Sequence, residues 1–307
     1  VETGGSGILS EGRFYVIRLA DGEVRCWGNN EDGQCNCPSD LRNVTSVVAS
    51  YSSAAAITKN GDVYCWGYGW PVSSQPVVTD ARSVGEAGSG KYFAILKCKR
   101  VVLFTNSGID NIENLELDSQ SVGSISDLSM WQSRYASVKA IVDEFGTTYY
   151  EAQETHGLFH RLRLKSYESR CLNDPGWISQ NLLGKEKVFR GKMWPQAKAV
   201  LIGEATCAEP RTTGWGAFIL TLLADGSVAA TGDNNYGQCG VPSSLRYGIK
   251  NIAVWTNVAM ALTHDGQIVC WGDNQFGQCN VPSDIGAAID MSFKAGVMED
   301  GRVVVWE

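Results

Sequence analysis

Few residues of this chain stand in patterns that could do chemistry. Residues 85–91 (Gly-Glu-Ala-Gly-Ser-Gly-Lys) fit the first seven positions of a phosphate-binding loop. Such a loop needs a hydroxyl residue next, to hold magnesium, and then a helix whose N-terminus binds phosphate. Tyr92 follows instead, and residues 93–96 (Phe-Ala-Ile-Leu) are typical of a strand. We therefore expect a turn between two strands here rather than a nucleotide site.

Histidines and acidic turns offer little to a metal or acid–base site. His156 and His160 have the spacing of two zinc ligands, but the accompanying Glu and a helical pattern are missing. The Asp-Asn pairs at 233–234 and 273–274 could suggest calcium, yet these residue types favour turns for their own hydrogen bonds. We expect no catalytic residue, no cofactor and no metal ion, and we predict that the protein is not an enzyme.

Three nearly identical segments show that the chain is built from repeated structural units. They are residues 26–39, 231–243 and 270–283, and each contains Gly-Gln-Cys and ends in Pro-Ser. Cys239 and Cys279 of the last two copies are 40 residues apart, and the first copy lies 204 residues before the second, close to five such periods. A fixed period near 40 is typical of an array of identical supersecondary units.

Each unit centres on a short turn that contains Gly and separates two apolar runs. Asn-Gly and Asp-Gly are strong β-hairpin signals, and both central residues of such a turn are expected to have positive φ. No segment shows a sustained helical stripe, so we expect an all-β chain with negligible helix. The clear turns are Asp21-Gly22, Asn60-Gly61, Asp225-Gly226, Asp265-Gly266 and Asp300-Gly301, with weaker ones at residues 97–99, 145–146 and 184–187.

The alanine-rich strand, the Asp-Gly-x-Val-x-x-Trp-Gly hairpin and the trailing Asn-x-x-Gly-Gln resemble the regulator of chromosome condensation repeat family. The Gly-Gln-x-x-Val-Pro ending and short period are more similar to its bacterial β-lactamase-inhibitor propeller and protist relatives. The motifs are strong over residues 12–67 and 217–283, recognisable at 289–306 and faded from about 105 to 215. The resemblance implies one closed β-propeller domain over residues 1–307, usually of seven blades. The eight turns leave seven and eight blades open.

Two residue types recur at fixed places in the units. Cys26, Cys65 and Cys270 lie four residues after the turn Gly, where other units have Ala or Val. Cysteine there is typical of a buried free thiol that replaces an apolar residue. Disulfides are the alternative: pairing within units joins Cys26 to Cys35 and Cys270 to Cys279 but leaves other cysteines unpaired. The redox compartment therefore stays open.

Tryptophan follows one residue later in four units, at Trp27, Trp66, Trp271 and Trp306. We expect these rings to pack between blades. Because both ends of the chain have blade sequence, we also expect the first and last units to lie side by side. Such closure removes the exposed strand edges that promote aggregation.

Charge is unevenly distributed over the divergent middle of the chain. Residues 109–154 contain nine acidic and two basic residues, whereas residues 156–198 contain nine basic and three acidic ones. Solvated loops would account for this, but it also predicts a docking surface that faces an acidic partner, because propeller loops are free to vary. The candidate partner-binding residues are Arg161, Arg163, Lys165, Arg170, Lys185, Lys187, Arg190 and Lys192.

Composition limits the classes of function. The 307 residues are 44% hydrophobic with a mean hydropathy of −0.13, and no apolar run is long enough to span a bilayer. The net charge of −7 argues against a nucleic-acid partner. The first residue, Val1, is compatible with a removed targeting segment, and no pattern indicates the compartment. We predict a noncatalytic protein-binding scaffold, a subunit or accessory of a larger assembly. The alternatives implied by the resemblance are a guanine-nucleotide exchange factor and an enzyme inhibitor.

Overall fold

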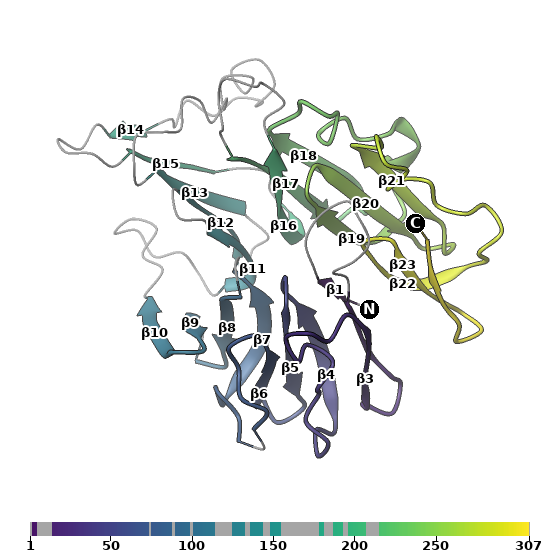
Figure 1. Cartoon of the computed structure of the whole chain (residues 1–307). Coiled ribbons are helices and arrows are strands. Elements are labelled where there is room, and N and C mark those ends of the chain that lie inside the picture. The colour runs from purple at the N-terminus through teal and green to yellow at the C-terminus, as the bar shows by residue number, and fades with distance from the viewer. Residues whose placement is uncertain are drawn as a thin grey trace. The chain divides into compact units, whose positions relative to one another are not determined.

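The computed structural model describes residues 2–4, 14–73, 75–87, 90–98, 101–113, 125–132, 136–143, 148–154, 178–180, 187–192, 196–206 and 215–306. Over these ranges the chain forms strands and no α-helix, as the sequence predicts; a short 3-10 helix, η2, covers Ser243–Leu245. The strands visible in Figure 1 form seven antiparallel sheets within the described residues. The chain divides into two compact units, Val1–Ser119 and Gln120–Glu307.

The first unit contains three sheets. In each of them, strands that follow one another in sequence are hydrogen-bonded neighbours. The first two sheets have three strands and the third has four. The strands are β1 (Glu2–Gly4), β2 (Phe14–Arg18) and β3 (Val24–Gly28); β4 (Val44–Ala49), β5 (Ser53–Thr58) and β6 (Val63–Gly67); and β7 (Ala81–Glu86), β8 (Tyr92–Leu96), β9 (Val101–Thr105) and β10 (Gly108–Glu113).

The second unit contains four sheets. One has five strands in the order β11-β12-β13-β15-β14, and the other three repeat the three-stranded pattern. The strands are β11 (Ile125–Gln132), β12 (Ala136–Asp143), β13 (Thr148–Glu154), β14 (Ile178–Gln180) and β15 (Lys187–Lys192); β16 (Ala197–Thr206), β17 (Trp215–Leu223) and β18 (Val228–Gly232); β19 (Ile249–Trp255), β20 (Val258–Thr263) and β21 (Ile268–Gly272); and β22 (Ala288–Ser292), β23 (Ala295–Met298) and β24 (Val303–Val305).

The two weakest predicted turns belong to one sheet. The turn at residues 145–146 falls between β12 and β13, and that at residues 184–187 falls between β14 and β15. Strand β13 pairs with β15, so both hairpins join the same five-stranded sheet. Residues 144–147 and 181–186 themselves lie outside the described residues. Eight predicted turns therefore correspond to seven sheets in the part of the chain that the structure describes.

The Asn-Gly and Asp-Gly hairpins are real, but their predicted backbone conformation is wrong. Only the glycine of each pair has positive φ, for example +97° at Gly61, whereas Asn60 does not. The Gly61 amide donates to the Thr58 carbonyl at 2.9 Å, and the Thr58 amide donates to the Asp62 carbonyl at 2.9 Å. This is a three-residue loop closed by a glycine bulge, in which only the last loop residue needs the left-handed conformation.

The turn glycines also join consecutive sheets within each unit. The carbonyl of Gly61 accepts a hydrogen bond of 2.9 Å from the amide of Ala81, the first residue of β7. A Cβ on Gly61 would lie 2.6 Å from the Ala81 carbonyl oxygen, so only glycine permits this approach. Gly22, Gly226 and Gly266 accept corresponding bonds from the first residues of β4, β19 and β22.

The middle strand of a sheet contributes to two separate cores. In β5 every residue is buried. Ala54 and Ala56 belong to a cluster with Phe14 of the preceding sheet, whereas Ala55 belongs to a cluster with Phe104 of the following sheet. Side chains alternate across a strand, so a strand covered on both faces reads as a continuous apolar run. Strand β20 divides in the same way, with Met260 in one cluster and Ala261 in the other.

Candidate functional site

The phosphate-loop-like segment is a turn between two strands, as predicted. Glu86 ends β7 and pairs with Tyr92, the first residue of β8. The Ala87 amide donates to the Lys91 carbonyl at 2.8 Å, and the Gly90 amide donates to the Ser50 hydroxyl at 3.0 Å. A strand, not a helix, follows the Lys, so the helix N-terminus that binds phosphate in a nucleotide site is missing at this place.

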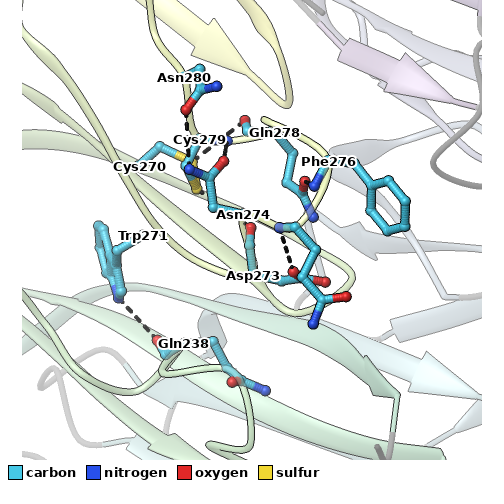
Figure 2. Close-up of a disulfide and its surroundings, with 10 residues drawn as sticks. Gln238, Cys270, Trp271, Asp273, Asn274, Phe276, Gln278, Cys279 and Asn280 are labelled. Carbon is cyan, nitrogen blue, oxygen red and sulfur yellow. Dashed lines mark hydrogen bonds between the residues drawn. A yellow bond between two sulfur atoms is a disulfide. The ribbon is translucent and has the colours of Figure 1, made fainter.

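A buried glutamine organises each of the three Gly-Gln-Cys loops. The Gln238 side chain accepts a hydrogen bond from the Tyr236 amide at 3.0 Å and donates one to an Asp233 carboxylate oxygen at 3.1 Å. Its main-chain carbonyl accepts the indole N–H of Trp271 at 3.0 Å (Figure 2). Gln34 makes the same three kinds of bond, the last from Trp66. Gln34 and Gln238 thus fix their own loops and tie them to the next sheet, whereas Gln278 binds the Phe276 amide within its own loop.

The Asp-Asn pairs are engaged by the same loops. The Asp273 carboxylate accepts the Gln275 amide at 3.0 Å, and the Asn274 side-chain oxygen accepts the Cys279 amide at 2.8 Å (Figure 2). The turn interpretation of these residues is therefore confirmed. Within the described ranges, no group of three or more His, Cys, Asp or Glu side chains could hold a metal ion. His156 and His160 lie outside those ranges.

One pair of cysteines is bonded, so the prediction of free core thiols is wrong for Cys270 and Cys279. These residues form a disulfide with their Cα atoms 5.0 Å apart (Figure 2). The strand β21 and the Gly-Gln-Cys loop bring the two apolar positions together, at a separation that suits a disulfide. Cys65, by contrast, is free and buried as predicted, and burial raises its pKa.

Three of the four repeated tryptophans are core residues. Trp66, Trp271 and Trp306 are buried, which confirms their predicted packing between sheets. Trp27 differs because it is partly exposed and stacks on Tyr15, with ring centroids 5.2 Å apart.

Of the predicted basic docking residues, the described part of the chain contains three. Lys187, Arg190 and Lys192 lie on β15. The register of β13 and β15 sets Lys187 opposite Glu154 and Arg190 opposite Glu151. The acidic segment and the basic segment thus meet at adjacent strands. The other five residues lie outside the described residues: Arg161, Arg163, Lys165, Arg170 and Lys185.

Four exposed aromatic side chains are not among the residues that the sequence predicts to be functional. Tyr51, Tyr68, Tyr247 and Phe276 are each more than half exposed. The Tyr68 amide donates to the Ser52 carbonyl at 2.9 Å, which joins the loops that carry Tyr68 and Tyr51. Large aromatic residues in otherwise polar turns were the available signal, since such residues are enriched at protein interfaces.

Comparison with known proteins agrees with these repeats. The family model of the regulator of chromosome condensation (RCC1) repeat matches residues 12–34, 44–69 and 257–278. No individually curated protein matches the chain by sequence. The more specific resemblance to the bacterial inhibitor and protist relatives is not tested by these matches. No helix in the described residues is both long and apolar enough to cross a bilayer.

Solved structures show the same fold at low sequence identity. Human WBSCR16 matches with a TM-score of 0.56 and 14% identity, over 95% of this chain and 83% of its own. Prp20p from Saccharomyces cerevisiae matches with a TM-score of 0.55 and 14% identity, over 99% of this chain and 79% of its own. The ectodomain of the Arabidopsis thaliana receptor kinase ACR4 matches with a TM-score of 0.55 and 12% identity, over 97% of this chain and 90% of its own. In its repeated glycine turns, glutamine loops and interleaved tryptophans, the chain resembles the regulator of chromosome condensation repeat, whose family model matches three of its segments.

Proposed function

We propose that the chain is a noncatalytic protein-binding propeller, a subunit or accessory of a larger protein assembly. The contrast between its sheets carries this proposal. The Gly-Gln-Cys loops engage their polar side chains within themselves, as Gln34 and Gln238 do. The sheet of β11 to β15 departs from that repeat, with five strands and with segregated charge in its sequence. Local departure from a constrained scaffold is typical of a surface adapted to a partner.

The proposed docking surface is the basic cluster between residues 161 and 192, and its proposed partner is a protein with an acidic surface. Charges at the rim of an interface act mainly on the association rate and on its dependence on salt.

Charge reversal tests this assignment. A variant with Lys185→Glu, Lys187→Glu and Lys192→Glu should associate with its purified partner at least about tenfold more slowly at low salt, and unfold at the same temperature as the parent. The partner is first identified by affinity purification from the native source. Association is then measured over a series of salt concentrations. An unchanged association rate would remove the basic cluster from the proposal.

A matched variant controls for net charge. Arg18, Lys59 and Arg246 are exposed and lie outside the cluster, so reversing these three to Glu changes the charge by the same amount. The control should associate nearly as fast as the parent, because its charges belong to other repeats and not to the proposed docking cluster. Equal losses in both variants would indicate a nonspecific effect of charge.

A second candidate function is guanine-nucleotide exchange or the inhibition of an enzyme. The likeness to Prp20p favours exchange, since the structure of that protein was described with its binding to Gsp1p and histones. At 14% identity the likeness carries over the scaffold only. Release of labelled guanine nucleotide from any GTP-binding protein that co-purifies separates the candidates. Faster release in the presence of the chain would favour exchange over simple docking.

The proposal includes a closed ring of the seven sheets, with the first beside the last. The supporting observation is coverage, because the propeller structures match nearly the whole chain. A closed ring would leave no open sheet at either end of the array and would give the docking loops a rigid base.

A further inference from the structure

Three thiols gather in the first repeat. Cys26 lies on β3, and Cys35 and Cys37 lie in the loop that follows it. All three are partly buried and pack against the apolar cluster that contains Phe14 and Trp66. Cys37 is the neighbour that raises the pKa of Cys26 most, and Cys35 adds a smaller electrostatic contribution, so the three thiols lie close together.

Two of these thiols occupy the positions of the disulfide in the sixth sheet. Cys26 pairs with Val16 across the hairpin as Cys270 pairs with Met260. The Cys35 amide is bound by the Asn30 side chain at 2.7 Å, as the Cys279 amide is bound by that of Asn274 at 2.8 Å. The backbone that permits one disulfide is therefore repeated around the free pair.

The third thiol gives Cys26 a choice of partner. Cys37 stands where the other repeats have Val241 and Val281. In the structure Cys26 lies near Cys37, whose sulfur is 3.7 Å from the Pro38 carbonyl oxygen, while the Cys35 sulfur lies 3.3 Å from the Asn29 carbonyl oxygen. Either sulfur can thus reach Cys26 by local rearrangement of one loop.

We propose that the first repeat is a thiol–disulfide exchange site, in which Cys26 forms a disulfide with either Cys35 or Cys37 and takes its oxidising equivalents from a low-molecular-weight disulfide such as oxidised glutathione. This goes beyond protein binding, because it assigns the chain a chemical substrate.

Cys37 is the attacking residue. The neighbouring Cys26 thiol and the positive charge of Arg42 lower the pKa of Cys37, and the thiolate is the nucleophile. Arg42 is held over the loop by bonds from one guanidinium nitrogen to the carbonyls of Ser39 at 2.9 Å and Leu41 at 2.8 Å. The neighbouring Cys37 and burial raise the pKa of Cys26, which therefore acts second.

The exchange balances in three steps. The Cys37 thiolate attacks one sulfur of oxidised glutathione, which forms a mixed disulfide and releases one glutathione thiolate. Cys26 then attacks the Cys37 sulfur and releases the second glutathione thiolate, so two protein thiols are oxidised while one glutathione disulfide is reduced to two thiols. The two protons of the protein thiols pass to the departing thiolates. Attack of Cys35 on the Cys26 sulfur displaces the Cys37 thiolate and moves the disulfide without further oxidation.

Cys239 provides an internal control. Its sulfur lies 3.2 Å from the Asp233 carbonyl oxygen, which is the environment of Cys35 in the first repeat. The position of Cys26 is taken by Ala230 in that repeat, and the position of Cys37 by Val241. Burial and the charge of Asp233 raise the pKa of Cys239 to about 12. Cys239 should therefore form no disulfide within its own repeat.

The test is a map of thiols in the full chain after equilibration with mixtures of reduced and oxidised glutathione. Free thiols are alkylated, and disulfide-linked peptides are identified by mass spectrometry. We expect both the Cys26–Cys35 and the Cys26–Cys37 linkage, with Cys239 still open to alkylation. Detection of only one linkage, or of none, at every glutathione ratio would overturn the proposal.

Single substitutions assign the roles. Cys35→Ser should leave only the Cys26–Cys37 linkage, formed at the parent rate. Cys37→Ser should leave only the Cys26–Cys35 linkage, formed at least about tenfold more slowly at neutral pH because the reactive thiolate is lost. An unchanged rate in Cys37→Ser would refute its role as nucleophile. Cys26→Ala should remove both linkages and leave the Cys270–Cys279 disulfide in place, which shows that the variant is folded.

Discussion

The indole N–H of Trp271 on β21 donates a 3.0 Å hydrogen bond to the main-chain carbonyl of Gln238, which lies in the loop after β18. Trp66 and Gln34 repeat this relationship at 2.9 Å. A side chain of one sheet thereby satisfies a buried backbone group of the preceding loop. The bond makes each loop part of the interface between two sheets.

Removing this bond should destabilise the protein without emptying the core. Trp66→Phe leaves the Gln34 carbonyl without its donor and should lower the free energy of unfolding by about 1–3 kcal/mol. Trp66→Ala also leaves a cavity beside Phe14 and should cost about 3–5 kcal/mol. Urea unfolding measures both. Trp27→Phe is the control, since Trp27 is partly exposed and its stack on Tyr15 survives the change. Equal effects at positions 27 and 66 would contradict the role of the bond.

Alanine substitutions at two turn glycines distinguish the cost of backbone strain from the cost of a steric clash. Gly61 and Gly301 have φ values of +97° and +84°, so alanine at either should cost roughly 1–2 kcal/mol. A Cβ at Gly61 would also lie 2.6 Å from the Ala81 carbonyl oxygen, whereas one at Gly301 would meet nothing within 4 Å. Gly61→Ala should therefore cost about 1–3 kcal/mol more than Gly301→Ala. Chemical unfolding of the two variants measures this difference. Similar free energies of unfolding would show that the backbone at Ala81 shifts at little cost to make room for the added methyl group.

Deletion of residues 303–307 tests closure of the proposed ring. It removes β24 and the buried Trp306, and should lower the melting temperature of the chain. In a closed ring, amide hydrogen exchange should also accelerate in β2 (Phe14–Arg18), since that sheet would lose its neighbour. Trp306→Ala, which keeps β24, is the control for loss of the indole side chain alone. Faster exchange confined to β19–β24 would indicate an open array.

Two cysteines of the first unit should differ in reactivity. Cys65 is buried and Cys98 is exposed. Burial raises the pKa of Cys65, so at about pH 8 less of it is thiolate than of an ordinary cysteine, and the reagent cannot reach it. Alkylation of Cys65 should be at least about a hundredfold slower than that of Cys98 and should track unfolding as urea is added. Rapid labelling of Cys65 in the native protein would show that the sheets around it open locally.

Much of the fold could be predicted because local signals repeat. The five Asp-Gly and Asn-Gly turns and the apolar runs beside them lie where the sequence places them. The turn conformation could not be predicted in the same way. Whether a loop has two or three residues depends on the register of its strands, and Asn60-Gly61 suits both geometries.

The candidate site could be predicted less well. Cys65 and Cys270 occupy the same place in the repeat, yet only Cys270 has a second cysteine within reach, and that distance is set by the folded loop. The charge pattern around Arg190 did predict a basic segment. It could not predict that Glu151 stands opposite Arg190, because strand pairing over such a separation is not written in local sequence.

The buried glutamines have a consequence for how new specificities could arise. Gln34, Gln238 and Gln278 bind the main-chain amides of residues 32, 236 and 276, and these residues are Asp, Tyr and Phe. The loop is thus anchored through backbone atoms that every amino acid but proline possesses. The side chain at that place can be exchanged, from acidic to aromatic, at little cost to folding. Each loop is a ready position for grafting a contact residue, by mutation in evolution or by design in the laboratory.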